Sequence, residues 1–169
     1  MTAAVWVFVG VAVAVAVVAV ALRWSPRTEL VTQVNIAAPP DRVWALLGHP
    51  QGYAAWNPFI VSMQGELVEG QTLANELQQA NGKRMRFNPV VHKVEVGREL
   101  RWRGRLLVPG LFDGEHYFVL HPSVDGSSTL LIHGEKFSGL LLWVLDVERF
   151  RQDFERMNQA LKTAVEQKQ

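Results

Sequence analysis

The chain has 169 residues, no cysteine and a formal net charge of +1, with 17 basic and 16 acidic side chains. The absence of cysteine excludes a disulfide framework and a cysteine-linked lipid anchor. The balanced charge gives no sign of nucleic-acid binding, and we expect no nucleic-acid partner. About 140 residues follow an apolar N-terminal run, which is enough for one domain with its own core.

The run from Ala3 to Leu22 contains Val, Ala, Leu, aromatic residues and one Gly, with no charged side chain. A helix of about 20 residues spans about 30 Å, the thickness of a bilayer's hydrocarbon core. We therefore expect a transmembrane helix over residues 3–22, a juxtamembrane tether over 23–29, and one folded domain over 30–166.

Positive charge lies only on the C-terminal side of this run, at Arg23 and Arg27. The positive-inside rule then predicts a single-pass membrane protein with a cytoplasmic C-terminal domain, and the bilayer is its first expected partner. A cleaved signal peptide is the alternative. The missing basic segment before the run and the length of the run argue against it.

The elements of the domain follow from periodicity and turn residues. The expected order is a strand at 30–36, a helix opened by 39–41 and ended by 48–50, a short helix or turn through 53–56, and strands at 59–67, 72–79, 83–96, 99–108, 115–121 and 129–137. Asn81-Gly82 is a hairpin signal, and Pro89 inside a predicted strand indicates a sheet edge or a bulge.

Apolar residues then recur every three or four positions from Leu140 to Val165, which predicts one long helix with a single apolar stripe. A run of antiparallel strands before a long helix is typical of an α+β domain. In the expected architecture, a curved antiparallel sheet wraps around the C-terminal helix.

Residues 34–44, which read VNIAAPPDRVW, and residues 53–59, which read YAAWNPF, resemble the opening of the START-like, or SRPBCC, superfamily. Residues 100–116 and 133–141 are similar to its polyketide cyclase/dehydrase and lipid-transport branch. The resemblance implies a helix-grip fold with a deep, mostly apolar cavity between the sheet and the long helix. It implies a hydrophobic small-molecule ligand and carries over no catalytic residue, since the superfamily shares none.

Strand alternation selects the inward-facing side chains without reference to any family. Arg101, Arg103 and Arg105 would face solvent, so Trp102 would face inward. The expected ligand-binding residues are Trp56, Phe59, Met63, Trp102, Phe112, His116, Phe118, His133, Glu135, Phe137, Trp143, Val147, Phe150 and Phe154. Each of them is equally compatible with plain core packing.

His116, His133 and Glu135 are the polar residues predicted to point inward together. They satisfy one another in the core, or orient the polar end of an apolar ligand, or perform acid–base chemistry or hold a metal. No nucleophile elbow, phosphate-binding loop or metal-ligand spacing accompanies them, so we expect no cofactor and no metal. The loop at 108–114 is the expected gate, with Leu111 and Phe112 at the cavity mouth or in the membrane.

The sequence thus favours a membrane-anchored domain that binds a hydrophobic small molecule such as a lipid, an isoprenoid quinone or a polyketide. A cyclase/dehydrase-type enzyme using His133, Glu135 and His116 is the alternative, and binding without catalysis is preferred. An interaction module with a filled core is the second alternative.

Overall fold

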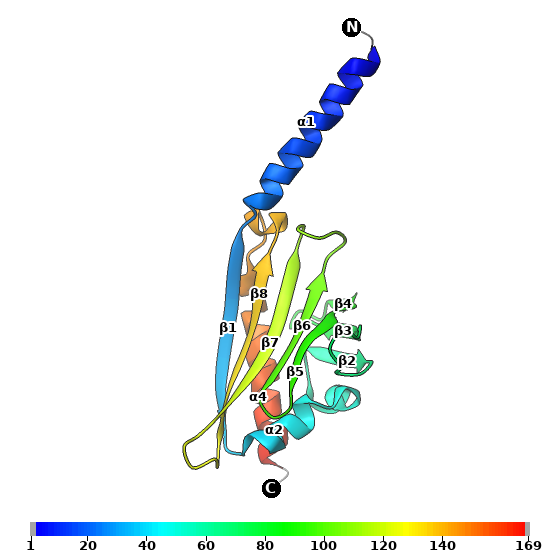
Figure 1. The fold of residues 1–169 in the computed structure, drawn as a ribbon. Helices are drawn as coiled ribbons and strands as arrows, with labels where there is room; N and C mark the ends of the chain where they lie inside the picture. Colours follow the sequence, from blue (N-terminus) through cyan, green and yellow to red (C-terminus); the bar gives the residue numbers. More distant parts are fainter. Residues whose placement is uncertain (1–2, 168–169) are drawn as a thin grey trace.

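A computed structural model describes residues 3–167, with the side chains of residues 3–5, 14, 15 and 18 outside the description. Helix α1 (Ala3–Arg23) projects from one end of the domain as a single rod (Figure 1). The predicted helix is therefore confirmed. Among the side chains that are described, no helix combines the length and the hydropathy that a membrane crossing requires, so the transmembrane span is not confirmed.

Five strands form the larger antiparallel sheet, in the spatial order β1-β8-β7-β6-β5. Their bounds are β1 Arg27–Ile36, β5 Val90–Glu95, β6 Glu99–Arg105, β7 Asp113–Pro122 and β8 Thr129–Ser138. Because β1 already begins at Arg27, only residues 24–26 separate it from α1.

Three further strands form a second antiparallel sheet, β2 (Ile60–Gln64), β3 (Ala74–Gln78) and β4 (Arg84–Phe87). The predicted turn at Asn81-Gly82 joins β3 to β4, and Gly82 has a φ of 81°. The expectation of one strand over 83–96 was wrong. Asn88 and Pro89 end β4, and the carbonyl of Pro89 instead accepts a hydrogen bond from the amide of Leu73 at 2.8 Å.

Short helices precede β2, namely α2 (Pro40–Leu47), the 3-10 helix η1 (Pro50–Gly52) and α3 (Tyr53–Trp56). The C-terminal helix α4 runs over Arg151–Glu166 and is shorter than predicted. Residues 140–150 instead form two 3-10 turns, η2 (Leu140–Trp143) and η3 (Val147–Phe150). Asp146 separates them, because its carboxylate accepts a hydrogen bond from the amide of Glu148 at 2.9 Å.

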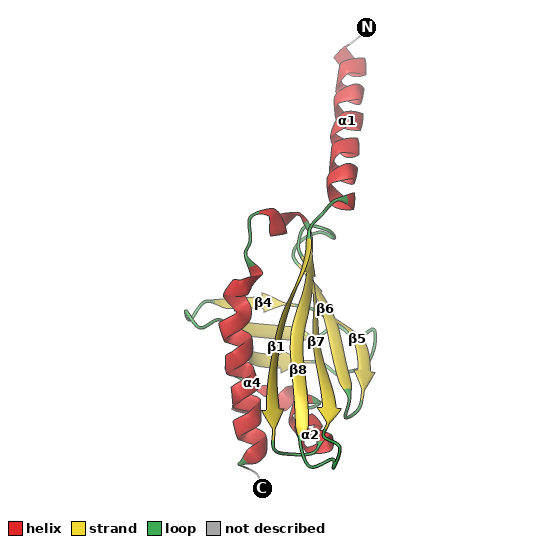
Figure 2. Ribbon diagram, turned by 90° about the vertical axis from the view of Figure 1, so that its left-hand side faces the viewer, coloured by secondary structure: helices red, strands yellow, loops and turns green. Residues whose placement is uncertain are grey.

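Helix α4 lies along β1 and β8 and covers the inner face of the larger sheet (Figure 2). Its apolar stripe, with Phe154, Met157 and Leu161, is buried against Leu30, Leu131 and other inward residues of the strands. Burial of this stripe stabilises the layer arrangement. The α+β helix-grip fold, with an antiparallel sheet against a C-terminal helix, is thereby confirmed.

Candidate functional site

The pairing register of the sheet brings the predicted polar residues together on the face toward α4. His116 of β7 pairs with Glu135 of β8 in one row. In the next row His133 of β8 lies between Phe118 of β7 and Thr32 of β1. Side chains in neighbouring positions of one face are close enough for direct contact.

These side chains form a continuous polar network of Glu135, His116, His133, Asn158 and Thr32. The Glu135 carboxyl oxygen Oε2 lies 3.2 Å from His116 Nδ1, and His116 Nε2 lies 2.8 Å from His133 Nε2. His133 Nδ1 lies 2.8 Å from Asn158 Oδ1, and Asn158 Nδ2 lies 2.9 Å from Thr32 Oγ1. The network links the internal strands β7 and β8, the edge strand β1 and the helix α4.

The direction of these hydrogen bonds follows from Thr32. Its hydroxyl donates to the carbonyl of His133 at 3.1 Å, and a carbonyl can only accept. Thr32 Oγ1 must then accept from Asn158, which turns Asn158 Oδ1 toward His133. His133 therefore carries its proton on Nδ1, and its bare Nε2 accepts from the Nε2 proton of His116. One proton remains to be shared between His116 Nδ1 and Glu135.

Burial decides where that shared proton resides. It lowers the pKa of His116 to about 3 and raises the pKa of Glu135 to about 8. Burial, together with the neighbouring His116, also holds the pKa of His133 well below its usual value. At neutral pH both imidazoles are uncharged and Glu135 is a carboxylic acid that donates to His116 Nδ1.

Aromatic rings enclose the two histidines. His133 stacks on Phe154 with ring centroids 4.2 Å apart and planes 6° apart, and on Phe118 at 4.5 Å. Trp102 stacks on His116 at 5.0 Å with planes 3° apart. Such an apolar enclosure explains the shifted pKa values, since it removes water from every ring nitrogen.

Glu135 is the end of the network that solvent can reach. Its side chain keeps 21% of its surface exposed, whereas His133 is fully buried. The second carboxyl oxygen, Oε1, lies against the backbone of Gly114 in the position that a Cβ would take there. The absence of a side chain at residue 114 therefore leaves the space in which the Glu135 carboxyl sits.

Replacing Gly114 by Ala should displace the Glu135 carboxyl toward solvent and break its contact with His116. A solvated carboxyl has an ordinary pKa, so the variant should lose the dependence of stability on pH between 6.5 and 8 that a buried acid imposes. Denaturant unfolding across this range measures the effect. Gly104→Ala is the matched control on β6, because its added Cβ would meet Phe87 instead. An unchanged pH dependence in Gly114→Ala would show that the carboxyl does not depend on this space.

Most of the predicted ligand-binding residues lie in the interior. Buried members are Phe59, Met63, Trp102, His116, Phe118, His133, Phe137, Val147 and Phe154, and half-buried members are Phe112, Glu135 and Phe150. Trp143 does not face the interior. It exposes 71% of its surface, because η2 replaces the predicted first turns of the long helix. Trp56 packs on Tyr53 at 5.0 Å beside the outer side of α4.

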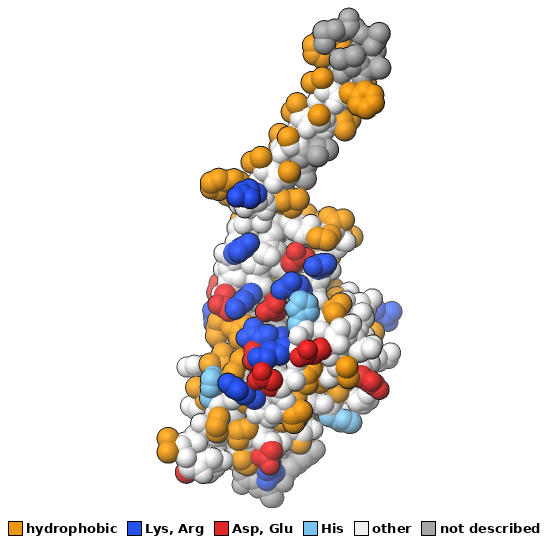
Figure 3. All heavy atoms as spheres, in the orientation of Figure 1, with side chains coloured by type: hydrophobic (Ala, Val, Ile, Leu, Met, Phe, Trp, Pro, Cys, Tyr) orange, Lys and Arg blue, Asp and Glu red, His pale blue; other side chains and the backbone are white. Residues whose placement is uncertain are grey.

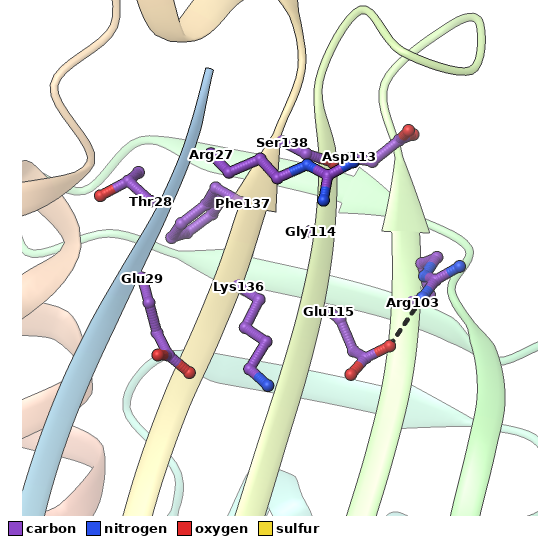
Figure 4. Close-up of a pocket in the computed structure, with 10 residues that line it drawn as sticks. All are labelled: Arg27, Thr28, Glu29, Arg103, Asp113, Gly114, Glu115, Lys136, Phe137 and Ser138. Carbon is purple, nitrogen blue, oxygen red and sulfur yellow. Dashed lines mark hydrogen bonds and ion pairs between the residues drawn. The ribbon is translucent and has the colours of Figure 1, made fainter. Parts of the chain in front are cut away.

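Between sheet and helix the inward rings contact one another, as in the stacking of His133 on Phe154 and Phe118. Hollows of the described residues also lie at the surface. One, of about 560 Å³, lies on the outer face of the sheet and is lined by charged side chains that include Arg27, Lys136 and Glu115 (Figure 4). The other, of about 530 Å³, lies between Trp56 and the outer side of α4.

The loop predicted as the gate, residues 108–114, is partly buried. Leu111 and Phe112 are half-buried, and Phe112 packs on Phe137 with ring centroids 5.5 Å apart. Leu106, Leu107 and Val108, which come before them, are exposed. The loop is tied to η2 by a hydrogen bond from the Leu141 amide to the Leu111 carbonyl at 3.0 Å, which accounts for the burial of its second half.

Asn158 and Thr32 were missed as site residues by sequence reasoning. A signal for Asn158 was present, since it follows Phe154 by one helical turn and so places an amide on an apolar stripe. Thr32 likewise alternates with inward-facing Leu30. Their contacts with His133 depend on the pairing of β1 with β8 and on the packing of α4 against these strands. The alternation of residues within one element does not specify either.

Comparisons with known proteins agree with this architecture. The family model described as polyketide cyclase/dehydrase and lipid transport matches residues 27–166. A START superfamily protein from Mycobacterium smegmatis is 17% identical, with a TM-score of 0.65 over 83% of this chain and 99% of that chain. Norcoclaurine synthase from Thalictrum flavum, in complex with dopamine and hydroxybenzaldehyde, is 10% identical, with a TM-score of 0.67 over 89% and 92%.

An aromatase/cyclase from a Streptomyces species is 19% identical, with a TM-score of 0.62 over 85% of this chain and 96% of that chain. At these identities the likeness concerns the fold alone. No curated protein matches this chain.

Proposed function

The chain belongs to the polyketide cyclase/dehydrase and lipid-transport family, and on that premise we propose that it binds an apolar small molecule whose hydroxyl group donates to Glu135. The observation that carries the proposal is the neutral Glu135 carboxyl at the solvent-reachable end of an otherwise buried polar network. Apolar sites with a few fixed polar groups are the usual form of small-molecule binding sites.

The hydrogen-bond direction specifies what Glu135 offers to a ligand. Its proton is engaged with His116 through Oε2, so Oε1 is a carbonyl-type acceptor. A ligand hydroxyl suits this acceptor, whereas a ligand carboxylate would be repelled. Phenolic or enolic polyketides, reduced isoprenoid quinones and lipid alcohols are ligand classes with this chemistry, and their apolar parts would contact rings such as Phe112 and Phe137.

Two variants of Glu135 test the proposal. Glu135→Gln should keep ligand affinity, because its amide donates to His116 and its oxygen still accepts. Glu135→Leu removes the acceptor, and affinity should fall about tenfold, the value of one hydrogen bond. The full chain, purified from its native host, is examined by native mass spectrometry for a bound molecule, which is then titrated against both variants. A protein that carries no molecule and takes up no anilinonaphthalene sulfonate probe would overturn the proposal.

Acid–base catalysis at the same site is the second candidate. It is favoured by the pKa of Glu135, about 8, since a group that titrates close to the working pH suits proton transfer. Glu135 would act as base in its ionised fraction, with His116 beside it. In Glu135→Gln, retained binding with lost turnover of the identified molecule supports catalysis, and retained turnover contradicts it.

Attachment of the domain to a membrane through α1 is part of the proposal. The helix exposes Trp6, Phe8 and Val17 by 63%, 78% and 61%, and it projects away from the domain (Figure 1). A lipid environment would remove this apolar surface from water. The full chain should float with lipid vesicles in a density gradient, and a chain that stays at the bottom would contradict the attachment.

A further inference from the structure

We propose that the end of the domain at the base of α1 is a lipid-contact surface, formed by Leu106, Leu107, Val108, Trp143 and Val144. This apolar end belongs to the folded domain and is distinct from α1. Its role rests on the proposed membrane attachment and would add to it a defined orientation of the domain on the bilayer.

The apolar end concentrates exposed hydrophobic side chains on two adjacent segments. Leu107, Trp143 and Val144 expose 84%, 71% and 80% of their surfaces. Apolar side chains also gather around the base of α1 in the space-filling view (Figure 3). Other exposed apolar residues of the described domain, such as Val68 and Val96, are on separate elements. A contiguous exposed apolar patch marks an interaction surface.

Backbone contacts hold three segments together at this end. The amide of Gly139 donates to the carbonyl of Pro26 at 3.2 Å, and the amide of Leu140 donates to the carbonyl of Gly110 at 3.0 Å. The side chain of Leu22, at the end of α1, lies over Gly110. The loop after β6, the turn η2 and the base of α1 are therefore one continuous surface.

The backbone of Leu107 argues for a function of the loop. Its φ of 63° places it in the left-handed region, where residues other than glycine are uncommon. Leucine is unfavourable there, and its exposed side chain makes no compensating contribution to the core. A strained residue that displays an apolar side chain to water is expected where a partner covers it.

Charge and aromatic content identify the partner as a bilayer. Residues 22–28, 104–112 and 138–145 contain no Asp or Glu, and Arg23 and Arg27 lie in them, while Arg105 pairs with Asp113, the residue after the loop, at 3.6 Å. Basic side chains suit anionic lipid headgroups, and Trp24 and Trp143 suit the boundary between headgroups and acyl chains. Trp24 exposes 76% of its surface beside this end.

The surface also bears on ligand access. Glu135 lies three residues before the end of β8 at Ser138, which adjoins η2. A domain seated on lipid by its apolar end would therefore present the Glu135 end of the polar network to the membrane. An apolar ligand could pass between bilayer and site without crossing the full length of the domain.

The experiment uses the lack of cysteine in the chain. Single variants Leu107→Cys and Val144→Cys of the full-length protein are labelled with the environment-sensitive fluorophore NBD. Val124→Cys is the matched control, since Val124 is a fully exposed apolar residue in the β7–β8 turn, at the opposite end of the domain (Figure 1). Each is mixed with vesicles of phosphatidylcholine and phosphatidylglycerol, with and without brominated acyl chains.

The probes at 107 and 144 should shift to shorter emission wavelengths on vesicles and be quenched by bromine, while the probe at 124 stays unchanged. Protein that floats with vesicles while all three probes stay water-exposed would overturn the lipid-contact surface and leave attachment by α1 standing. Protein that does not float would overturn both. A shift that depends on protein concentration without vesicles would show that the surface joins two copies of the chain, and would also overturn the proposal.

Discussion

Glu135→Gln should abolish a fall in stability of about 1–2 kcal/mol that the unaltered protein shows between pH 6.5 and 8. The folded protein holds the Glu135 proton up to about pH 8, but the unfolded chain releases it near the ordinary value of 4.5. Folding therefore binds a proton in this range, and stability falls as pH rises. Gln cannot ionise, and its amide replaces the donated hydrogen bond to His116.

The buried histidines do not mask this effect. His116 and His133 have lowered pKa values, so they make stability rise with pH only up to their ordinary value of 6.5. Urea unfolding at pH 6.5, 7.25, 8 and 9, each followed by circular dichroism, measures the change. Glu115→Gln is the control on the outer face of the sheet, where Arg103 and Arg101 help hold the pKa of Glu115 low and leave it ionised throughout. A stability that is flat from pH 6.5 to 8 in the unaltered protein would contradict a protonated Glu135.

Asn158→Leu should destabilise the protein by about 2 kcal/mol, because it leaves the Nδ1 proton of His133 buried without an acceptor. It should also leave His133 free to carry its proton on either ring nitrogen. In the unaltered protein, nitrogen NMR of the imidazoles should show the proton on Nδ1 of His133 and on Nε2 of His116. In the variant, this fixed assignment should be lost at both rings, since His116 takes its direction from His133.

Thr32→Val tests the second hydrogen bond of Asn158, which its amide donates to the Thr32 hydroxyl. It removes the acceptor of the Asn158 amide but leaves the bond between Asn158 and His133, so the expected destabilisation is smaller, about 1 kcal/mol. The double variant should show coupling, since the residues share one network. If Asn158→Leu proves as stable as the unaltered protein, with the same tautomers, the network does not set the protonation of the site.

Local pattern predicted the parts of the site that lie on one element. Period-two alternation placed His133 and Glu135 on the same face of one strand, because successive side chains of a strand point to opposite sides. The same alternation placed Trp102 on the inward face, between arginines on the solvent face, and Trp102 is buried. These inferences needed no knowledge of the neighbouring strands.

Contacts between distant elements could not be predicted in the same way. Asn158 and Thr32 are separated by 126 residues, and they meet because β1 pairs with β8 and α4 crosses both. Trp143 was placed in the interior because the apolar spacing continued into η2, and the spacing does not record that the Asp146 carboxylate restarts the helix. The Asp146 side chain competes with the backbone carbonyls for the Glu148 amide, and this competition ends the continuous helix before η3.

The sequence by itself determined that an apolar helix precedes one α+β domain, which family the domain resembles, and which side chains of each strand face inward, since all three depend on periodicity and order along the chain. Only the tertiary structure decided that Glu135 is a neutral acid, that aromatic rings fill the space around the histidines, and that two distant loops join the base of α1 in one apolar end. Protonation and exposure depend on what surrounds a group in space, and the chain order does not specify those surroundings.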